Sequence, residues 1–344
     1  MEHSKLSDYD YYLPLELIAQ EPLRERDRSK MLVLDRTSGR REDSTFNQLP
    51  AYLRAGDLLV MNDTKVIPAR LIGKLAGKAA AAEILLLHKL ANGNWVAMVK
   101  PGRKLKPGAS VEFALSVEAL IVDYAEEGLR EVQFKSIEAF EDVLPRLGKV
   151  PLPPYITKDV DDFDQYQTIY ADKDGSAAAP TAGFHFTNNV FDALKQKGIN
   201  TAYITLHIGP GTFQPVKVDD IRDHVMHREY FRIDLSTAAA INRTKNDGGR
   251  VIAVGTTACR VLETAAGDHG QIIGPQEGWT GIYIYPGFQF RAVDAMLTNF
   301  HLPRSSLMML VSALAGRDLI ITAYREAVEK RYRFFSFGDC MLIL

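Results

Sequence analysis

The sequence predicts an α/β protein: a main domain built on a mixed sheet, with a small β-barrel-like domain inserted into it. Two short apolar runs, at residues 31–34 and 58–61, are typical of buried strands. Between residues 69 and 134, short runs of β-forming residues are separated by glycine- or lysine-rich turns. From about residue 185 onward, strand-like and helix-like segments alternate, as they do in α/β layers.

These changes of pattern set the expected domain boundaries. Residues 1–67 form the first part of the α/β domain, residues 68–150 the inserted β-barrel-like domain, and residues 151–344 the main part of the α/β domain. The strands expected in the insertion are 69–72, 83–87, 95–99, 110–113, 119–122 and 131–134. A helix over 136–147 and a proline-stiffened segment over 150–155 then lead back to the main domain.

The second half supplies most of the expected α/β layer. Its expected strands are 201–206, 230–233, 251–254 and 282–285, and its expected helices are 190–197, 237–245, 258–265, 306–315 and 319–331. Ligands of such sheets bind at the carboxyl ends of the strands. The loops after Leu206, Val254 and Tyr285 are therefore the places where we expect chemistry.

Composition indicates a globular chain without a global preference for polyanions. The 344 residues are 46% hydrophobic, which is enough to bury a large core. Lysine and arginine number 41 against 43 aspartate and glutamate, for a net charge of −2. A nucleic-acid partner must therefore be bound by a local basic patch.

The cysteines and the first residues point to a reducing compartment. Cys259 and Cys340 lie far apart in sequence, which disfavours both a disulfide scaffold and a cysteine-rich zinc site. The polar beginning of the chain does not resemble a signal peptide, and the most apolar run, 307–315, is too short to span a bilayer. We expect a cytoplasmic protein that does not enter a membrane.

Two histidines lie in segments suited to ligand binding. His185 belongs to a loop of small residues that ends at Thr187, which is well placed to cap the next helix. His207 follows an expected strand and precedes two glycines that let the backbone approach a ligand. The alternative for each is structural: a connector histidine bonded to the backbone, or a satisfied core histidine in a tight turn.

A third segment is suited to an anionic group. The strand 251–254 runs into Gly255, Thr256 and Thr257 and then a helix, a layout in which the helix N-terminus receives a carboxylate or phosphate. It matches neither the Walker loop nor the dinucleotide fingerprint. Cys259 in that helix is interpreted as core filler.

Other polar clusters support narrower expectations. His224 and His227 lie one helical turn apart, but they need a third ligand to bind metal, so no metal site is expected. Asn299 and His301 directly precede the helix at 306. Of two basic stretches, 24–30 is interleaved with acids, whereas 100–106 is uncompensated and better suited to phosphate; the alternative for the second is a solvated lysine-rich loop.

Motifs spread along nearly the whole chain closely resemble the S-adenosylmethionine:tRNA ribosyltransferase-isomerase family of queuosine biosynthesis. Their number and order make the resemblance specific. The matching segments are 10–23, 62–70, 150–156, 166–170, 179–187, 205–213, 254–257, 298–303 and 332–339.

The resemblance implies both a fold and an activity. The fold is a monomer with an α/β domain and an inserted β-barrel-like domain. The activity is transfer and isomerisation of the ribosyl moiety of S-adenosylmethionine onto 7-aminomethyl-7-deazaguanine at the tRNA wobble position. Epoxyqueuosine-tRNA, adenine and methionine are the products. S-adenosylmethionine is a co-substrate, and no prosthetic group or metal is implied.

This chemistry needs proton donors and acceptors, a place for the sulfonium against aromatic faces, and an anchor for the anticodon arm of the tRNA. The residues expected to supply them are His185, His207, His301, Asp63 and Asp339 for catalysis; Thr256, Thr257, Arg260, Asn299, Phe184 and Phe186 for substrate binding; and Lys100, Arg103, Lys104 and Lys106 for tRNA binding. Thr256, Thr257 and Arg260 would surround the methionine carboxylate.

Two other functions remain open at this level. A non-catalytic RNA-binding protein would use the β-module to bind the anticodon arm and would release no adenine. A conventional methyltransferase would instead produce S-adenosylhomocysteine, although no glycine-rich turn follows a first strand as such enzymes require.

Overall fold

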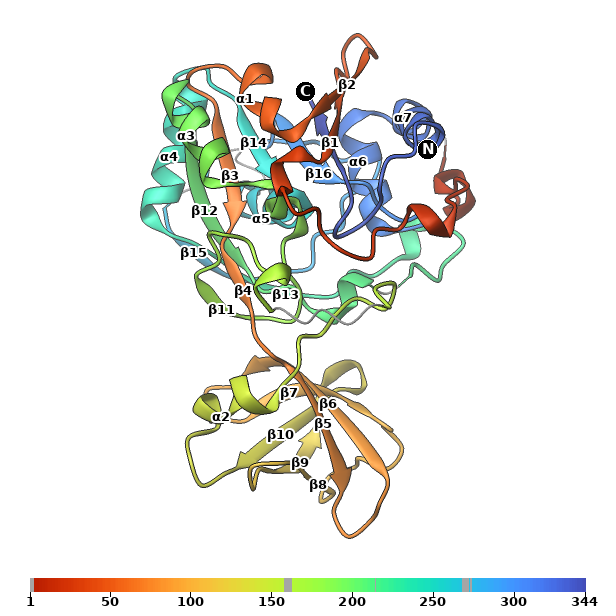
Figure 1. Cartoon of the computed structure of the whole chain (residues 1–344), viewed down its shortest axis with the longest axis vertical. Helices are drawn as coiled ribbons and strands as arrows, with labels where there is room; N and C mark the ends of the chain where they lie inside the picture. Colours follow the sequence, from red (N-terminus) through yellow and green to blue (C-terminus); the bar gives the residue numbers. More distant parts are fainter. Residues whose placement is uncertain (1–2, 158–162, 214, 268–271, 273) are drawn as a thin grey trace. The chain divides into compact units, whose positions relative to one another are not determined.

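The computed structural model describes residues 3–157, 163–213, 215–267, 272 and 274–344, and the chain packs into two compact units (Figure 1). The main unit comprises 1–64, 154–173 and 180–344, and the second unit comprises 65–153 and 174–179. The predicted fold class is confirmed. The domain boundaries expected from the sequence stay a prediction.

A nine-stranded mixed sheet forms the centre of the main unit, in the order β15-β13-β12-β3-β14-β16-β17-β1-β2. In that order the strands are Gln276–Thr280, Glu229–Ile233, Asn200–Leu206, Leu58–Asn62, Val251–Val254, Ala295–Asn299, Cys340–Ile343, Lys30–Leu34 and Arg41–Thr45. β12, β3, β14 and β16 are parallel, so their carboxyl ends share one edge. β17 is antiparallel to β16 and parallel to β1, which brings the amino ends of β17 and β1 to that same edge.

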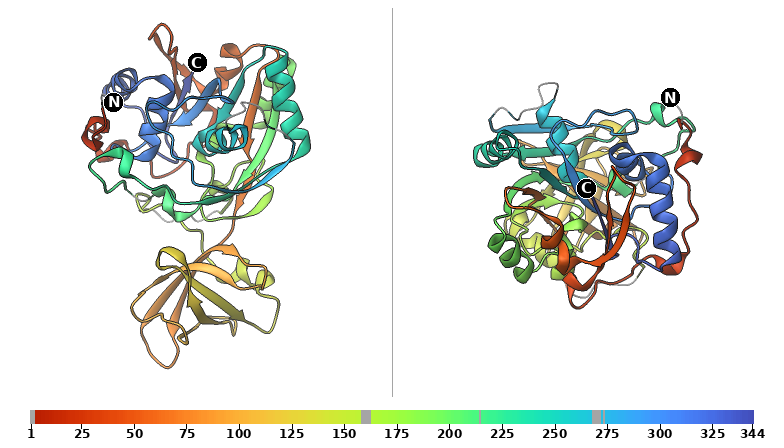
Figure 2. Two further views of the ribbon diagram at one scale, coloured as in Figure 1. Left: turned by 180° about the vertical axis from the view of Figure 1, so that it is seen from behind. Right: turned by 90° about the horizontal axis from the view of Figure 1, so that it is seen from above.

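Burial of the central strands explains the parallel arrangement. Every residue of β3 and β14 is buried, as expected for strands covered on both faces. α1 (Leu49–Tyr52) and α3 (Asn188–Gln196) pack into the core cluster on one face. α4 (Leu235–Asn246) and α5 (Gly255–Ala266) pack along β12, β3 and β14 (Figure 2).

Capping side chains mark where several helices begin. Thr187 accepts a hydrogen bond from the amide of Val190 at the start of α3, and Asp234 and Ser305 do the same for α4 and α6 (Ser306–Ala315). α7 (Arg317–Glu329) follows α6 directly. No single helix in the described ranges is long and apolar enough to cross a membrane; α6 and α7, bent by 115°, pass that test only as a pair.

One strand prediction in the main unit is wrong, and others were missed. Residues 282–285 form no strand, because their groups are used elsewhere: the carbonyl of Ile282 accepts from Arg260, and the Tyr283 ring packs edge-on against His224 at 5.1 Å. The strand lies just before, at β15. The charged edge strand β2 and the strands β16 and β17 were not foreseen.

The second unit is a closed barrel of six strands in the order β10-β7-β6-β5-β8-β9 (Figure 1). In that order the strands are Arg130–Lys135, Trp95–Lys100, Ala81–Lys89, Arg70–Leu75, Ser110–Glu112 and Glu118–Tyr124. α2 (Phe140–Leu147) packs on the barrel core, with the Phe140 and Phe134 rings stacked at 3.9 Å. The helix expected from 136 begins only at Phe140, because Ser136 to Ala139 form a turn in which the Ser136 hydroxyl donates to the Glu138 carbonyl. β4 (Thr64–Val66) and β11 (Lys173–Ser176) form a separate two-stranded sheet.

Candidate active site

The shared edge of the main sheet gathers most of the predicted site residues. Asn62 ends β3 and Asp63 follows it, His207 follows β12, Gly255 begins α5 after β14, and Asn299 ends β16. Because the four strands are parallel, these groups occupy one edge. The amino ends of β1 and β17 add Ser29 and Asp339 to the same edge.

Asn62 connects three elements at the centre of this edge. Its carbonyl oxygen accepts from the amides of Thr64 (3.1 Å) and Leu206 (3.0 Å). Its amide nitrogen donates to the carbonyl of Leu206 (3.0 Å) and to the hydroxyl of Thr257 (3.3 Å). The side chain is 1% exposed, so these bonds replace those it would make to water. Asn62 was not predicted as a site residue; it fixes the backbone that carries Asp63 and His207.

His207 follows Leu206, which Asn62 bonds, and Asp63 follows Asn62 itself. Nδ1 of His207 is 2.8 Å from the hydroxyl of Thr64, and its ring stacks on Tyr230 with centroids 5.8 Å apart. Asp63 accepts from the hydroxyl of Thr205 at 2.7 Å. Burial raises the pKa of Asp63 above its ordinary value, although the bond from Thr205 opposes the shift. A carboxylate of raised pKa is suited to accept a proton.

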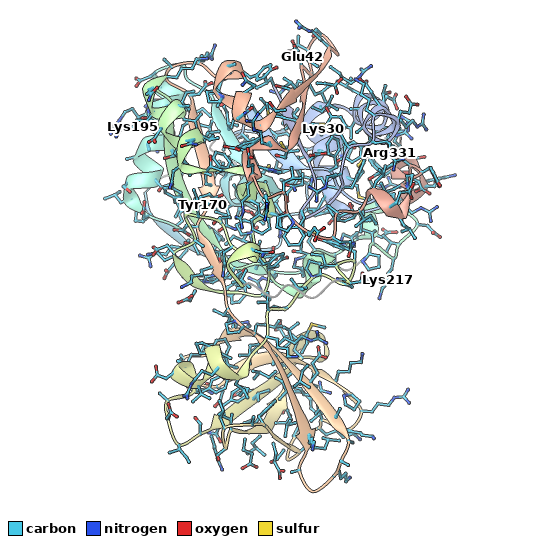
Figure 3. The ribbon with its side chains drawn as sticks, viewed as in Figure 1. Lys30, Glu42, Tyr170, Lys195, Lys217 and Arg331 are labelled. Atoms are coloured by element: carbon cyan, nitrogen blue, oxygen red, sulfur yellow. The ribbon has the colours of Figure 1, made fainter. Side chains whose placement is uncertain are left out.

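The loop that carries His185 crosses the same edge. Its short helical turn, Thr181–His185, lies against the start of α5, since a Cβ on Gly255 would be 3.5 Å from Ala182. A Cβ on Gly183 would lie 1.9 Å from the hydroxyl oxygen of Tyr170, a partly buried residue labelled in Figure 3. Only glycine fits at position 183, and the close approach sets the path of the loop.

His185 is buried and hydrogen-bonded to Ser29. Nδ1 is 2.7 Å from the hydroxyl of Ser29, and the ring lies 5.1 Å from that of Phe46. Nε2 is buried and has no partner of normal hydrogen-bond geometry among the described residues. Burial lowers the pKa of His185 to about 4, although the side chain of Asn299 and the backbone of Arg26 raise it in part. The imidazole is therefore neutral at neutral pH, and Asn299 is the side chain that acts on it opposite Ser29.

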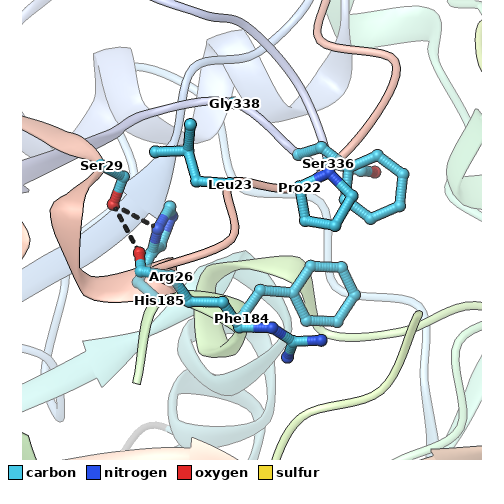
Figure 4. Close-up of a pocket in the computed structure, with 9 residues that line it drawn as sticks. Pro22, Leu23, Arg26, Ser29, Phe184, His185, Ser336 and Gly338 are labelled. Atoms are coloured by element: carbon cyan, nitrogen blue, oxygen red, sulfur yellow. Dashed lines mark hydrogen bonds between the residues drawn. The ribbon is translucent and has the colours of Figure 1, made fainter. Parts of the chain in front are cut away.

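A small pocket opens beside His185 (Figure 4). It is lined by Pro22, Leu23, Arg26, Ser29, Phe184, His185, Ser336, Phe337 and Gly338. Its free volume is about 20 Å³, which accommodates one water molecule but not a nucleoside.

Arginine and aromatic rings close this pocket. The Arg26 guanidinium lies 5.4 Å from the centre of the Phe184 ring, and Phe184 stacks on Phe337 at 5.9 Å. Arg26 also donates to the carbonyls of Gln167 (2.8 Å) and Gln165 (3.2 Å). A cation already lies on the aromatic face, and its hydrogen bonds join two segments of the main unit across the pocket.

The C-terminal loop forms the opposite wall. Asn299 donates to the carbonyl of Phe335 at 2.9 Å, and Phe335 has a φ of +72°, which is strained for a bulky residue. The next residue, Ser336, is 2.6 Å from the hydroxyl of Tyr155. The side-chain oxygen Oδ1 of Asn299 is buried with no partner of normal geometry in the described part of the chain. Asn299 thus holds a strained turn against the pocket.

Asp339 is bound by backbone groups. One carboxylate oxygen accepts from the amide of Lys30 (2.8 Å) and the other from the amide of Arg333 (2.7 Å). Burial raises the pKa of Asp339, although these amides oppose the shift. Both oxygens are therefore used to fix the ends of β1 and of the C-terminal loop.

His301 lies in the core rather than in the pocket. Its Nε2 is 2.9 Å from the hydroxyl of Thr298, its amide donates to the hydroxyl of Tyr324 at 3.1 Å, and its carbonyl accepts from Tyr11. Burial lowers the pKa of His301 to about 3. Phe186 is likewise completely buried in the core cluster, against Phe46 and away from the pocket lining.

Arg260 forms a buried ion pair with Glu229, a residue that the sequence did not single out. Glu229 also accepts from the amide of Gly209 (2.9 Å) and the hydroxyl of Thr212 (3.1 Å), and His227 lies 3.2 Å from it. Burial alone would raise the pKa of Glu229, but Arg260, His227 and the Gly209 amide outweigh it and lower the pKa to about 2. The pair anchors the glycine loop after His207 to α5.

The predicted tRNA-binding cations and the expected lack of a metal site concern parts of the chain outside this edge. Lys100, Arg103, Lys104 and Lys106 are all exposed, in the second unit. No group of three or more metal-binding side chains occurs among the described residues, and His227 faces Glu229 instead. A larger hollow of about 400 Å³ lies beside Trp279 and Phe288, and no predicted site residue lines it.

The structure therefore brings together His185, Phe184 and the missed residues Arg26, Ser29, Ser336 and Phe337 around one pocket, and Asp63, His207 and Thr257 around Asn62. Ser29 and Arg26 lie in a basic stretch that the sequence interpretation set aside because its acids interleave. Glu229 carried only a weak signal, as a lone acid directly before the expected strand 230–233.

Comparisons with known proteins agree on one family. The family model described as queuosine biosynthesis protein matches residues 6–343. An S-adenosylmethionine:tRNA ribosyltransferase-isomerase of Acetivibrio thermocellus is 52% identical over 340 residues, covering 98% of this chain and 99% of that protein. A protein of the same name from Symbiobacterium thermophilum is 52% identical over 341 residues, covering 99% and 100%. The crystal structure of an S-adenosylmethionine tRNA ribosyltransferase from Thermotoga maritima matches with a TM-score of 0.57 and 38% identity, covering 98% of this chain and 100% of that one.

Proposed function

The chain belongs to the queuosine biosynthesis protein family, and we propose that it acts as an S-adenosylmethionine:tRNA ribosyltransferase-isomerase. The observation that carries the proposal is 52% identity to proteins of that name over nearly the whole chain. The reaction transfers and isomerises the ribosyl moiety of S-adenosylmethionine onto 7-aminomethyl-7-deazaguanine at the tRNA wobble position. It leaves epoxyqueuosine-tRNA, adenine and methionine.

His185 is the catalytic residue that the geometry supports best. Its ring is held by Ser29 through Nδ1, while Nε2 has no partner of normal geometry among the described residues. A neutral imidazole that lines a pocket can exchange a proton with a ligand bound there. We assign His185 the role of a general acid or base that exchanges a proton with S-adenosylmethionine.

Asp63 and His207 are assigned to a second proton-transfer position. The raised pKa of Asp63 favours acceptance of a proton from the aminomethyl group of the substrate base, which must be uncharged to attack. His301 and Asp339 are assigned positioning roles, because their polar atoms already bond to Thr298 and to backbone amides.

The first turn of α5 is assigned to the methionine carboxylate. Thr256 and Thr257 lie at the N-terminus of this twelve-residue helix, where backbone amides and the helix dipole favour an anion. Arg260 supports the site from the next turn: one guanidinium nitrogen pairs with Glu229, and Nη2 is buried without a partner among the described residues.

Phe184 and Phe337 are assigned to the sulfonium, which an aromatic face attracts. Asn299 holds the wall of that pocket, and Phe186 supports the loop from the core. Lys100, Arg103, Lys104 and Lys106 are assigned to the anticodon arm of tRNA. The protein works as a cytoplasmic monomer, with S-adenosylmethionine as co-substrate and no prosthetic group.

Product analysis tests the proposal. The protein is incubated with S-adenosylmethionine and a tRNA that carries 7-aminomethyl-7-deazaguanine at the wobble position, and adenine and methionine are quantified. We expect equal amounts of both, and none with the same tRNA carrying guanine there. S-adenosylhomocysteine as product would indicate a methyltransferase, and tRNA binding without any product would indicate a binding protein.

A further inference from the structure

Arg130 is a buried cation of the second unit that has no acidic partner among the described residues. It is the first residue of β10, and it is 7% exposed. No carboxylate among the described residues lies within ion-pair distance of its guanidinium. Removing a guanidinium from water is expensive unless other groups replace the lost hydration, so its surroundings must be unusually well arranged.

Backbone carbonyls from two loops provide that compensation. Nε donates to the carbonyl of Leu105 at 2.7 Å and Nη2 to that of Gly102 at 3.1 Å. Nη1 donates to the carbonyls of Gly128 at 2.5 Å and Leu129 at 3.0 Å. One planar guanidinium therefore joins the loop after β7 to the turn before β10, a task that suits arginine's fixed fork of donors.

Further contacts hold both the arginine and the loop. The Tyr124 ring lies 4.5 Å from the guanidinium carbon, in cation–π geometry. Leu105 is completely buried in the barrel core, and the amides of Lys104 and Leu105 both bond to the carbonyl of Pro101. The side of the loop that faces the barrel is thus held by Leu105 in the core and by the bonds from Arg130.

The outer side of the same loop carries the exposed cations. We call residues 100–106 the basic loop; its four cations, at positions 100, 103, 104 and 106, are all exposed. None of them forms an ion pair with a described residue. Their outward direction follows from the inward direction of Leu105 and of the carbonyls that Arg130 binds.

We propose that Arg130 is a positioning residue for tRNA: it holds the basic loop in one shape, so that the loop's cations reach several phosphates of one backbone at once. The proposal rests on the proposed function, which supplies the tRNA. A fixed loop binds more tightly than a mobile one because its ordering cost is already met before the tRNA arrives. The buried positive charge adds to the field of the loop, but geometry is its main contribution.

Arg130→Lys separates geometry from charge. Lysine keeps the charge but is a single point donor, so it cannot bond carbonyls of both loops at once. We expect the Kd for the anticodon stem-loop to rise about tenfold. The log–log salt slope should fall by roughly 2 units, as expected when two or three phosphate contacts are lost. Arg130→Met should behave similarly, and S-adenosylmethionine binding should be unchanged in both.

Arg146→Lys is the matched control, because Arg146 is an exposed arginine of the same unit that pairs with Glu138. It should leave tRNA binding unchanged. Limited trypsin digestion gives a second readout: cleavage after Arg103 and Lys104 should accelerate in Arg130→Lys, and tRNA should block it in the wild-type protein.

Three results would overturn the positioning role of Arg130, and a fourth would contradict the proposed function. Wild-type affinity and salt slope in Arg130→Lys overturn the inference, and so does failure of tRNA to protect the basic loop in the unmodified protein. A lower melting temperature with an unchanged salt slope assigns Arg130 a merely structural role and also overturns it. Wild-type protein that binds no tRNA at all contradicts the proposed function itself.

Discussion

Replacing Glu229 with glutamine should destabilise the main unit strongly while changing few atoms. Glutamine can still accept the bonds from the amide of Gly209 and the hydroxyl of Thr212, but the negative charge is lost. Arg260, which is 3% exposed, is then left buried without its counter-charge. Breaking a buried ion pair by removing one partner costs about 3–5 kcal/mol.

Thermal unfolding followed by circular dichroism measures this cost. At roughly 2 °C per kcal/mol for a chain of this size, the melting temperature should fall by about 6–10 °C. Replacing Arg260 by methionine as well should recover part of the loss, since the unpaired charge is removed with it. Glu277→Gln is the control, because Glu277 is an edge-strand acid that bonds the hydroxyl of Tyr230 in an exposed position.

The same pair predicts a pH dependence that Glu229→Gln should lack. The folded pKa of Glu229, about 2, lies below the ordinary value of 4.5. Its stabilisation is therefore complete above pH 4.5 and disappears as the pH falls toward 2. A melting temperature of Glu229→Gln within 2 °C of wild type at pH 7 would refute the reasoning, because it would mean that Arg260 finds compensation elsewhere.

Four further predictions concern the pocket and the basic loop. His185→Ala should lower kcat by roughly 10²- to 10⁴-fold with folding and tRNA affinity retained; a loss of melting temperature without a selective loss of turnover would show a structural histidine. Gly183→Ala places a Cβ 1.9 Å from the Tyr170 hydroxyl oxygen, so it should lower kcat, and adding Tyr170→Phe should restore part of it; full activity of the single variant would contradict the close approach. His185 and His301 have folded pKa values of about 4 and about 3, below the ordinary 6.5, so the unfolded chain binds more protons and stability should fall as pH decreases from 6.5 toward 4; an unchanged melting temperature between pH 6.5 and 5 would contradict this. Replacing three cations of the basic loop by alanine should reduce the salt slope of tRNA binding by roughly 2 to 3 units while S-adenosylmethionine affinity stays near wild type; an unchanged slope would place the tRNA elsewhere.

The sequence was informative where local pattern decides structure. Fully apolar runs such as β14 were located correctly because strands covered on both faces need no alternation. Capping residues such as Thr187 marked helix starts for an equally local reason. The run of β-forming residues 282–285 was misleading, because its backbone and rings contact Arg260 and His224 from other parts of the chain.

The residues of the candidate site likewise divide into those that local sequence identifies and those that it does not. His185 and His207 could be selected from the glycines and small residues beside them. Ser29 and Glu229 could not, since their importance comes from partners 156 and 31 residues away in sequence. Arg26 was set aside because neighbouring acids interleave with it, yet its guanidinium is directed onto Phe184. Such pairings depend on the order of strands in the sheet, which no local pattern specifies.

The pocket beside His185 must enlarge before it can hold a nucleoside, and the structure identifies the parts that would have to move. A volume of about 20 Å³ is far below the several hundred that a nucleoside requires. The β-strands around it are fixed by the sheet, whereas the contacts of Arg26 with described residues include two carbonyl bonds and a ring contact, each individually weak. A sulfonium and a guanidinium cannot share one aromatic face, because two like charges in contact repel each other. Displacement of Arg26 from Phe184 therefore follows from assigning the sulfonium to that ring, and it would release the segment at 165–167 at the same time.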